Sequence, residues 1–298
     1  MRVVSIAGAT CAALSLCLSS ITAYAQPTSQ QWREIETKYI FGFTEGSGVG
    51  LEGEKEFSLD TEARLGKSGG HYYASETKFE YEFTPNQYVQ FELGPFASAH
   101  SIKGVDGLDD RSQLAFGGFF GEMRYLLLDR STSPVAVTLS AEPEWRRIDE
   151  TSGEVVDNFE LELKVNADAE LIKNTLYLGS NLLYEPEITH DPDHIGAGWE
   201  PESKVGISGA LSYRVVSSVL IGAEVWYLRH YDGAWLNNFT GDAVYVGPTL
   251  FVQLNPKMFI SAAWDVQVAG SDVEDAAAKL NLAEFSRQRA KFKVAVEF

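Results

Sequence analysis

Polar side chains, many of them carboxylates with lysine and arginine among them, occupy every second position in several segments of this sequence. The clearest segment is 159–171, FELELKVNADAEL, in which each odd position is apolar and each even position is Glu, Lys, Asn or Asp. Charges fixed on one face either pair with one another or attract mobile ions of opposite sign. Because carboxylates outnumber cations, the pattern favours cations or cationic solutes, unless the charges cross-pair and only fill space.

Histidines offer a second kind of chemistry. The densest group is 190–194, HDPDH, whose imidazoles and carboxylates are possible ligands for a divalent metal. The proline and the lack of any enforced helix leave the ligand geometry undefined, so we expect an ordinary polar loop and predict neither a metal site nor a cofactor. All five histidines fall at expected strand ends or in loops on one side: His71, His100, His190, His194 and His230.

Catalytic motifs are weak in this sequence. Outer-membrane phospholipases are twelve-stranded barrels that use a His-x-Ser pair, but the expected strands contain no such pair and His100-Ser101 has the wrong spacing. No glycine-rich phosphate loop follows a strand and opens a helix. We therefore predict that the protein is not an enzyme, and keep a hydrolase using loop or rim residues as a minor alternative.

Composition narrows the choice of class. The chain has 298 residues, 24 Lys and Arg against 42 Asp and Glu, and a formal net charge of -18. Nucleic-acid phosphates require a basic surface, so we predict no nucleic-acid partner. The charged fraction of 22% is too high for a bundle of membrane helices. Any insertion into a membrane must therefore use strands.

The first 25 residues have the pattern of a cleaved secretory signal peptide. Arg2 precedes an apolar run that ends near Ile21, and the small-x-small triplet Ala23-Tyr24-Ala25 follows. An uncleaved membrane anchor is the alternative. Cys11 and Cys17 both lie in this segment, so the mature protein is expected to form no disulfide. We assign residues 26–53 to a periplasmic or plug-like segment, because 34–50 alternates weakly and a thirteenth strand would disturb the parity of the termini. Residues 34–50 could equally be part of a longer first hairpin.

Strands are the elements that must position the charged residues, because hydrophobicity with a period of two places alternate side chains on opposite faces. Short links alternate with longer, polar connections after the second strand, as in outer-membrane barrels. Residues 54–298 are therefore predicted to form an all-β, transmembrane, antiparallel up-and-down barrel. Twelve strands are expected, at 54–67, 72–84, 87–99, 112–128, 134–148, 158–171, 175–188, 202–216, 218–231, 243–254, 258–269 and 287–298.

With this alternation, the polar face of each strand is assigned to the lumen and the apolar face to lipid. A slip by one residue would place charges in the bilayer at a cost of about 2–4 kcal/mol for a midplane Arg or Lys. The predicted lumen-facing residues are Asp60, Glu62, Arg64, Lys78, Glu80, Glu82, Glu92, Arg124, Glu142, Glu144, Arg146, Glu160, Glu162, Lys164, Asp168, Glu185, Lys204, Arg214, Glu224, Asp265, Lys291 and Lys293.

The last segment, 287–298, ends on an aromatic residue. Phe292, Val294, Val296 and Phe298 alternate with charged or small residues. This ending resembles the C-terminal signal of bacterial outer-membrane barrels, and the resemblance implies recognition by the barrel-assembly machinery. A closed barrel needs this strand to pair with the first one and leave no open edge.

Four stretches carry a wider resemblance, at 39–50 (YIFGFTEGSGVG), 107–119 (GLDDRSQLAFGGF), 142–154 (EPEWRRIDETSGE) and 220–224 (LIGAE). They resemble uncharacterised outer-membrane barrels of Gram-negative, particularly alphaproteobacterial, bacteria, and loosely the transporter barrels named for a phenol-degradation pathway. The resemblance implies location in the outer membrane, with lipid and lipopolysaccharide as partners.

Transport is the function that these expectations favour. We predict a passive channel or transporter for small solutes, with cationic solutes as the finer expectation. The alternative is a closed structural or surface-binding barrel. A soluble periplasmic β-protein is a further, minor alternative.

Overall fold

The computed structural model describes residues 36–192 and 198–298. The expected signal peptide and His194 lie outside the described residues. Within the described ranges, no helix has the length and hydropathy needed to cross a membrane.

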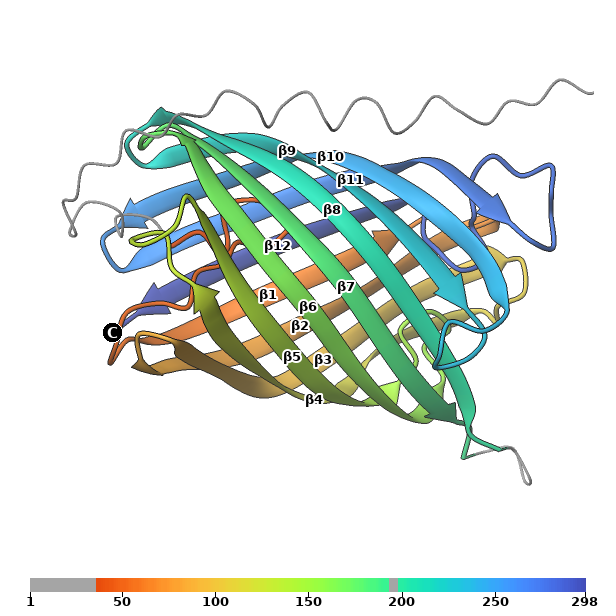
Figure 1. Ribbon diagram of the computed structural model, residues 1–298. Helices are drawn as coiled ribbons and strands as arrows, with labels where there is room; N and C mark the ends of the chain where they lie inside the picture. The colour runs from red at the N-terminus through yellow and green to blue at the C-terminus, as the bar shows by residue number, and fades with distance from the viewer. Residues whose placement is uncertain (1–35, 193–197) are drawn as a thin grey trace, which may run out of the picture. The chain divides into compact units, whose positions relative to one another are not determined.

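Twelve strands form one closed antiparallel barrel (Figure 1). Each strand pairs with its neighbour in sequence, and the last strand pairs with the first, from Glu56 opposite Glu297 to Leu65 opposite Gln288. The predicted up-and-down barrel with twelve strands is therefore confirmed. The strands are β1 (Lys55–Leu65), β2 (Gly69–Asn86), β3 (Val89–Val105), β4 (Arg111–Leu128), β5 (Val135–Ile148), β6 (Val155–Ile172), β7 (Leu176–His190), β8 (Glu200–Val216), β9 (Val219–Tyr231), β10 (Phe239–Asn255), β11 (Met258–Asp272) and β12 (Gln288–Glu297).

Several strands extend further than the sequence pattern indicates. Strand β2 begins at Gly69 and β10 begins at Phe239. In both places the chain continues to pair with its neighbour, Gly69 with Val105 and Phe239 with Tyr231. Pairing at these ends includes Gly and polar residues, so hydrophobic periodicity alone underestimates the strand length.

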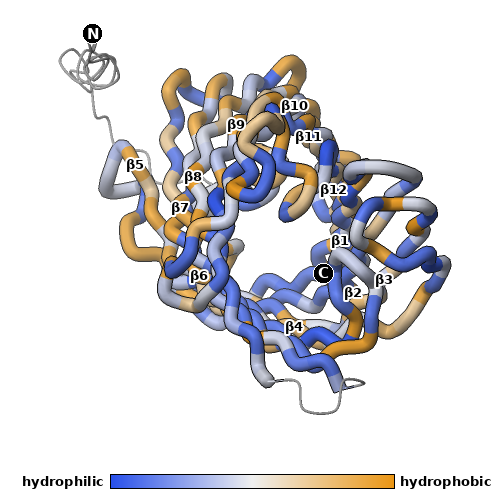
Figure 2. The backbone as a smooth tube through the Cα atoms, turned by 90° about the vertical axis from the view of Figure 1, so that its right-hand side faces the viewer, coloured by the Kyte–Doolittle hydropathy of each residue, from blue (hydrophilic) through white to orange (hydrophobic). Residues whose placement is uncertain are grey.

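Side chains alternate between the two faces of the barrel wall, and hydrophilic and hydrophobic residues alternate along many strands in Figure 2. On β9, Ile221 and Val225 are about half exposed, whereas Glu224 and Trp226 are buried. The exposed side chains of the outer face are mostly apolar, including Leu139, Phe159 and Leu211. An apolar outer face with a polar inner face is the arrangement of a membrane barrel.

Residues 36–50 enter the lumen at the end of the barrel where the short turns lie, and we call this segment the plug. Its Tyr39, Ile40 and Phe41 are buried against the inward face near that end, on Tyr177, Leu220, Phe251 and Phe259. Ser261 on β11 donates to the backbone oxygen of Tyr39 at 2.8 Å. The plug is therefore an internal element of the barrel, although the sequence left its location open.

Candidate functional site: the charged lumen

A polar cavity of about 240 Å³ lies inside the barrel, between the plug and the connections at the opposite end. The plug contributes Lys38, Tyr39 and Glu45 to its lining, and the connections contribute Glu150 and Glu284. Fourteen carboxylates and ten cationic side chains line it. Carboxyl groups therefore outnumber cationic groups in the cavity wall.

Ion pairs link charged side chains of nearby strands where β12 pairs with β1 and closes the barrel. Lys293 on β12 lies 2.6 Å from Glu80 on β2, so the pair reaches across β1. Lys291 lies 3.0 Å from Glu62 and 3.3 Å from Asp60. Charged hydrogen bonds of this length fix the side chains in position, so this part of the wall is a rigid, paired surface.

A second group of charges lies on β2, β5 and β6. Arg146 is 2.6 Å from Glu76 and 3.8 Å from Glu160, and it also pairs with Glu144. Lys78 is 3.1 Å from Glu144 and contacts Glu142 more closely. Three strands thereby contribute to one network, which lies in the cavity wall.

Lys38 connects the plug to this charged wall. Its Nζ lies 2.9 Å from Glu82, 2.8 Å from Glu92 and 3.4 Å from Glu122. Burial by itself lowers the pKa of Lys38, but the three carboxylates outweigh burial and raise this pKa well above its usual value. The lysine is therefore a fixed positive charge.

Glu45 is the complementary negative charge of the plug. It lies 2.6 Å from Lys164 on β6 and also pairs with Arg124 on β4. Burial raises the pKa of Glu45, but Lys164 and Arg124 outweigh burial and hold this pKa well below its usual range. The plug thus carries charges of both signs, each matched to the wall.

Two carboxylates of the wall hold the plug through its backbone amides and a hydroxyl group. Asp168 accepts from the amide of Ser47 at 2.6 Å and from the hydroxyl of Thr37 at 2.8 Å. Glu224 accepts from the amides of Phe43 and Thr44 at 2.9 and 2.7 Å. These contacts satisfy amides of an irregular segment that has no strand partner for them.

All of the predicted lumen-facing residues lie in the described part of the chain, on inward positions of their strands, and none is exposed. The structure divides them by role. Glu160 and Glu162 line the cavity, whereas Asp168 and Glu224 bind the plug. Arg214 stands apart, near the short turns, where it donates to Tyr177 and to the backbone of Ser217.

Sequence reasoning missed several charged members of the site. Glu76, Glu122 and Arg289 occupy inward positions beside predicted residues, so a stricter application of the same alternation would have included them. Lys38 and Glu45 carry no such signal, because the plug has no strand periodicity. Their partners lie 44 to 119 residues away in the chain.

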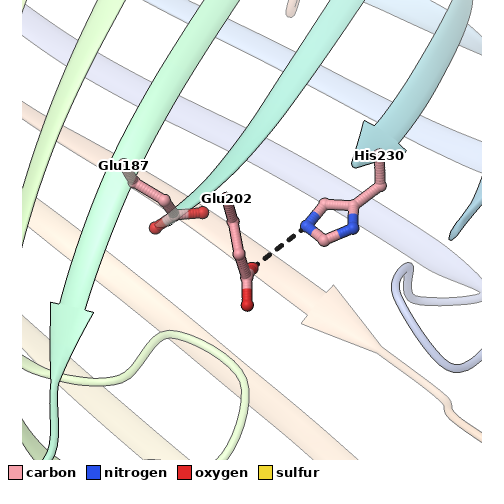
Figure 3. Close-up of side chains that lie close together, drawn as sticks. All are labelled: Glu187, Glu202 and His230. Carbon is pink, nitrogen blue, oxygen red and sulfur yellow. Dashed lines mark hydrogen bonds and ion pairs between the residues drawn. The ribbon is translucent and has the colours of Figure 1, made fainter. Parts of the chain in front are cut away.

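One group of described side chains has the composition of a metal site. Glu187, Glu202 and His230 lie near one another on β7, β8 and β9 (Figure 3), and one ligand atom from each falls within 4.8 Å of the others. This group is different from the 190–194 segment that the sequence singled out. That segment is described only in part, so its metal binding is untested.

Comparisons with known proteins agree with this fold. The model of a family of unknown function (DUF6662) matches residues 33–298. No curated protein matches this chain. The crystal structure of the COG4313 outer membrane channel from Pseudomonas putida F1 is similar, with a TM-score of 0.54 and 11% identity over 85% of this chain and 97% of that chain.

Two porins align less closely. The NanC porin and the KdgM porin both have a TM-score of 0.44 and 10% identity. They cover 81% and 82% of this chain, and 98% and 99% of their own chains. The likeness to the outer-membrane channel concerns the fold, which is that of an outer-membrane β-barrel.

Proposed function

We propose that this chain, which belongs to the family of unknown function DUF6662, conducts small solutes across the outer membrane of a Gram-negative bacterium. The observation that carries the proposal is the charged cavity of about 240 Å³ inside a closed barrel. A cavity of this size accommodates an ion with its water or a small polar molecule. The apolar outer face supports insertion in a bilayer, where closed barrels satisfy every strand edge.

Cations are the solutes that the lumen charge favours. Carboxylates exceed cationic groups in the cavity wall, and fixed negative charge in a confined space raises the local concentration of cations. The plug lies beyond the cavity and bears one strongly paired cation, Lys38. In this proposal solutes enter the cavity from the extracellular end, and displacement of the plug completes the path.

A closed structural barrel is the second candidate, and the plug itself favours it. Lys38 and Glu45 are paired with five wall residues, and apolar plug residues are buried beside them. A plug that never leaves would seal the lumen. The two candidates differ in whether loosening the plug produces conductance.

Reconstitution in a planar bilayer tests the proposal. The folded protein is expected to give discrete conductance steps, and a variant with a loosened plug is expected to give larger or more frequent ones. Folding would be checked first by heat-modifiable migration in gels. If neither protein conducts ions or admits solutes into vesicles, the channel proposal is wrong and the closed barrel is favoured.

Envelope partners belong to the same proposal. Lipid and lipopolysaccharide would surround the outer face, and the barrel-assembly machinery would read Phe292, Val294, Val296 and Phe298. Phe298 stacks on Phe57 with ring centroids 5.2 Å apart, so the terminal residue also contributes to the seam between β12 and β1. Kinship with transporter barrels named for a phenol-degradation pathway, and an alphaproteobacterial source, remain expectations from the sequence.

A further inference from the structure

Glu187, Glu202 and His230 come from three adjacent strands, β7, β8 and β9, at the end of the barrel opposite the short turns (Figure 3). Inward positions bring them together, because Glu202 lies opposite Glu187 in the β7–β8 pairing. His230 follows on β9, where the next inward position of β8, Lys204, lies opposite it. The wall of a barrel is rigid, so it presents the three side chains together.

His230 is oriented by groups behind its ring. The His230 side chain is 6% exposed, and its Nδ1 lies 2.9 Å from Thr240 Oγ1 and 3.4 Å from a carboxylate oxygen of Glu284. A carboxylate can only accept, so Glu284 favours the tautomer with hydrogen on Nδ1. The lone pair of Nε2 then points toward Glu202, whose oxygen is 3.1 Å away.

Two acceptors that face each other at this distance need a positive charge between them. Either a proton on Nε2 or a metal ion can supply this charge. Metal-bound histidines have this arrangement, in which the second ring nitrogen donates to a carboxylate or another oxygen and fixes the ring. Thr240 and Glu284 have that role here.

Glu187 is available as the third ligand. Its nearest cation, Lys204, lies 3.6 Å away but is only 2.7 Å from Glu185. Asn158 donates to one oxygen of Glu187 at 2.8 Å, which holds the carboxylate in place while the other oxygen stays free of that bond. The stronger partner of Lys204 is therefore Glu185.

We propose that Glu187, Glu202 and His230 bind a divalent transition-metal ion such as Zn²⁺ at the extracellular mouth of the barrel. One imidazole and two carboxylates form a ligand set that suits Zn²⁺ better than Mg²⁺ or Ca²⁺, which prefer oxygen ligands alone. Metal–ligand bonds of about 2.0–2.2 Å place tetrahedral ligand atoms a little over 3 Å apart. The separation between Nε2 and the Glu202 oxygen, 3.1 Å, agrees with this requirement.

The site would have three protein ligands and leave a fourth position for water or a solute atom. It would also join β7, β8 and β9, so a bound ion should stabilise the folded barrel. This inference does not depend on conduction, because metal binding would serve a channel and a closed barrel equally.

Isothermal titration of the refolded, untagged barrel in detergent with Zn²⁺ tests the site. We expect one ion per barrel, with little response to Mg²⁺. His230→Gln and Glu202→Gln should each weaken binding by at least about 100-fold, because loss of a surrounding second-layer group alone costs about 10–100-fold. Zn²⁺ should raise the thermal midpoint of the parent protein but not that of either variant. Two different variants guard against one that fails to fold.

Matched controls separate this site from other histidines at the same end. His71→Gln changes an exposed histidine on β2 and should bind Zn²⁺ as the parent protein does. His190→Gln tests the 190–194 segment. The proposal is overturned if no Zn²⁺ binds, which would leave a protonated His230 as the bridging charge. It is also overturned if His190→Gln abolishes binding while His230→Gln retains it.

Discussion

Lys38 shows how a single residue can set the state of the lumen. It is 3% exposed and lies within 3.4 Å of three carboxylates from β2, β3 and β4. Without this cation, Glu82, Glu92 and Glu122 would repel one another in a confined space. The lysine therefore stabilises both the docked plug and the wall that receives it.

Replacing Lys38 with methionine should lower the free energy of unfolding by about 3–5 kcal/mol, the usual cost of removing one partner from a buried ion pair. Urea unfolding in phospholipid vesicles, followed by tryptophan fluorescence, measures the change. Lys55→Met is the control, because Lys55 is exposed at the start of β1 and its loss should change stability by less than about 0.5 kcal/mol. Equal effects of the two variants would contradict the central position given to Lys38.

At the scale of elements, the strands and the plug differ in how much the sequence could predict. Period-two hydrophobicity indicated all twelve strands, because one face contacts apolar surroundings and the other contacts charge along the whole length. The inward positions of residues such as Glu160 and Lys293 follow from the same alternation. The alternation does not predict their ion-pair partners, because a pair can span more than one strand. Lys293 on β12, for example, reaches Glu80 on β2 across β1.

The sequence left the position of the plug open for a physical reason. Its structure is set by hydrogen bonds to side chains that are distant in sequence. Ser261 donates to the backbone oxygen of Tyr39, and Asp168 accepts from the amide of Ser47. It has only an isolated bridge between Phe41 and Thr44. A segment without periodicity therefore offers no local signal for its position, and composition cannot distinguish a periplasmic extension from a segment inside the lumen.

Gly42 provides a test of plug docking. Its φ of 91° favours glycine, and a Cβ there would lie 2.3 Å from a Glu224 oxygen, 2.7 Å from Thr249 and 2.8 Å from Ala263. Gly42→Ala should therefore loosen the plug by at least about 1 kcal/mol for the backbone plus the cost of these overlaps. Conductance in planar bilayers should rise.

Gly53→Ala is the matched control for this experiment. Gly53 has a φ of 85°, but a Cβ there would meet no atom within 4 Å. The two variants therefore share the backbone cost and differ only in contact with the lumen wall. If Gly53→Ala raises conductance as much as Gly42→Ala, plug docking is not what limits the current.

The apolar outer face of the barrel must lie at the depth of the bilayer core. Arginine substitutions at two positions along one strand test where that core lies. Leu163 and Leu171 are both exposed residues on the outward face of β6, near the middle of the strand and near its end. Leu163→Arg should destabilise the barrel in vesicles by about 2–4 kcal/mol, and Leu171→Arg by about 0–1 kcal/mol. Urea unfolding measures both. Equal costs would argue against a bilayer centred on the barrel wall.

The charge of the whole lumen determines which ions should pass. Fourteen carboxyl groups against ten cationic groups in the cavity wall favour cations over anions, so we expect the parent channel to select cations. Glu160 and Glu162 line this cavity, whereas Asp168 holds the plug, so the first two are the better positions for changing selectivity without changing docking.

Neutralising both cavity carboxylates, in Glu160→Gln with Glu162→Gln, should move the reversal potential across a salt gradient toward zero. Glu274→Gln is the control, because Glu274 is exposed in the β11–β12 connection and salt screens its charge over about 10 Å at 0.1 M. That variant should keep the selectivity of the parent. Anion preference in the parent, or equal shifts in the two variants, would show that lumen charge does not select the solute. Selectivity would then have to arise at the mouth, where the connections rather than the strands present their charges.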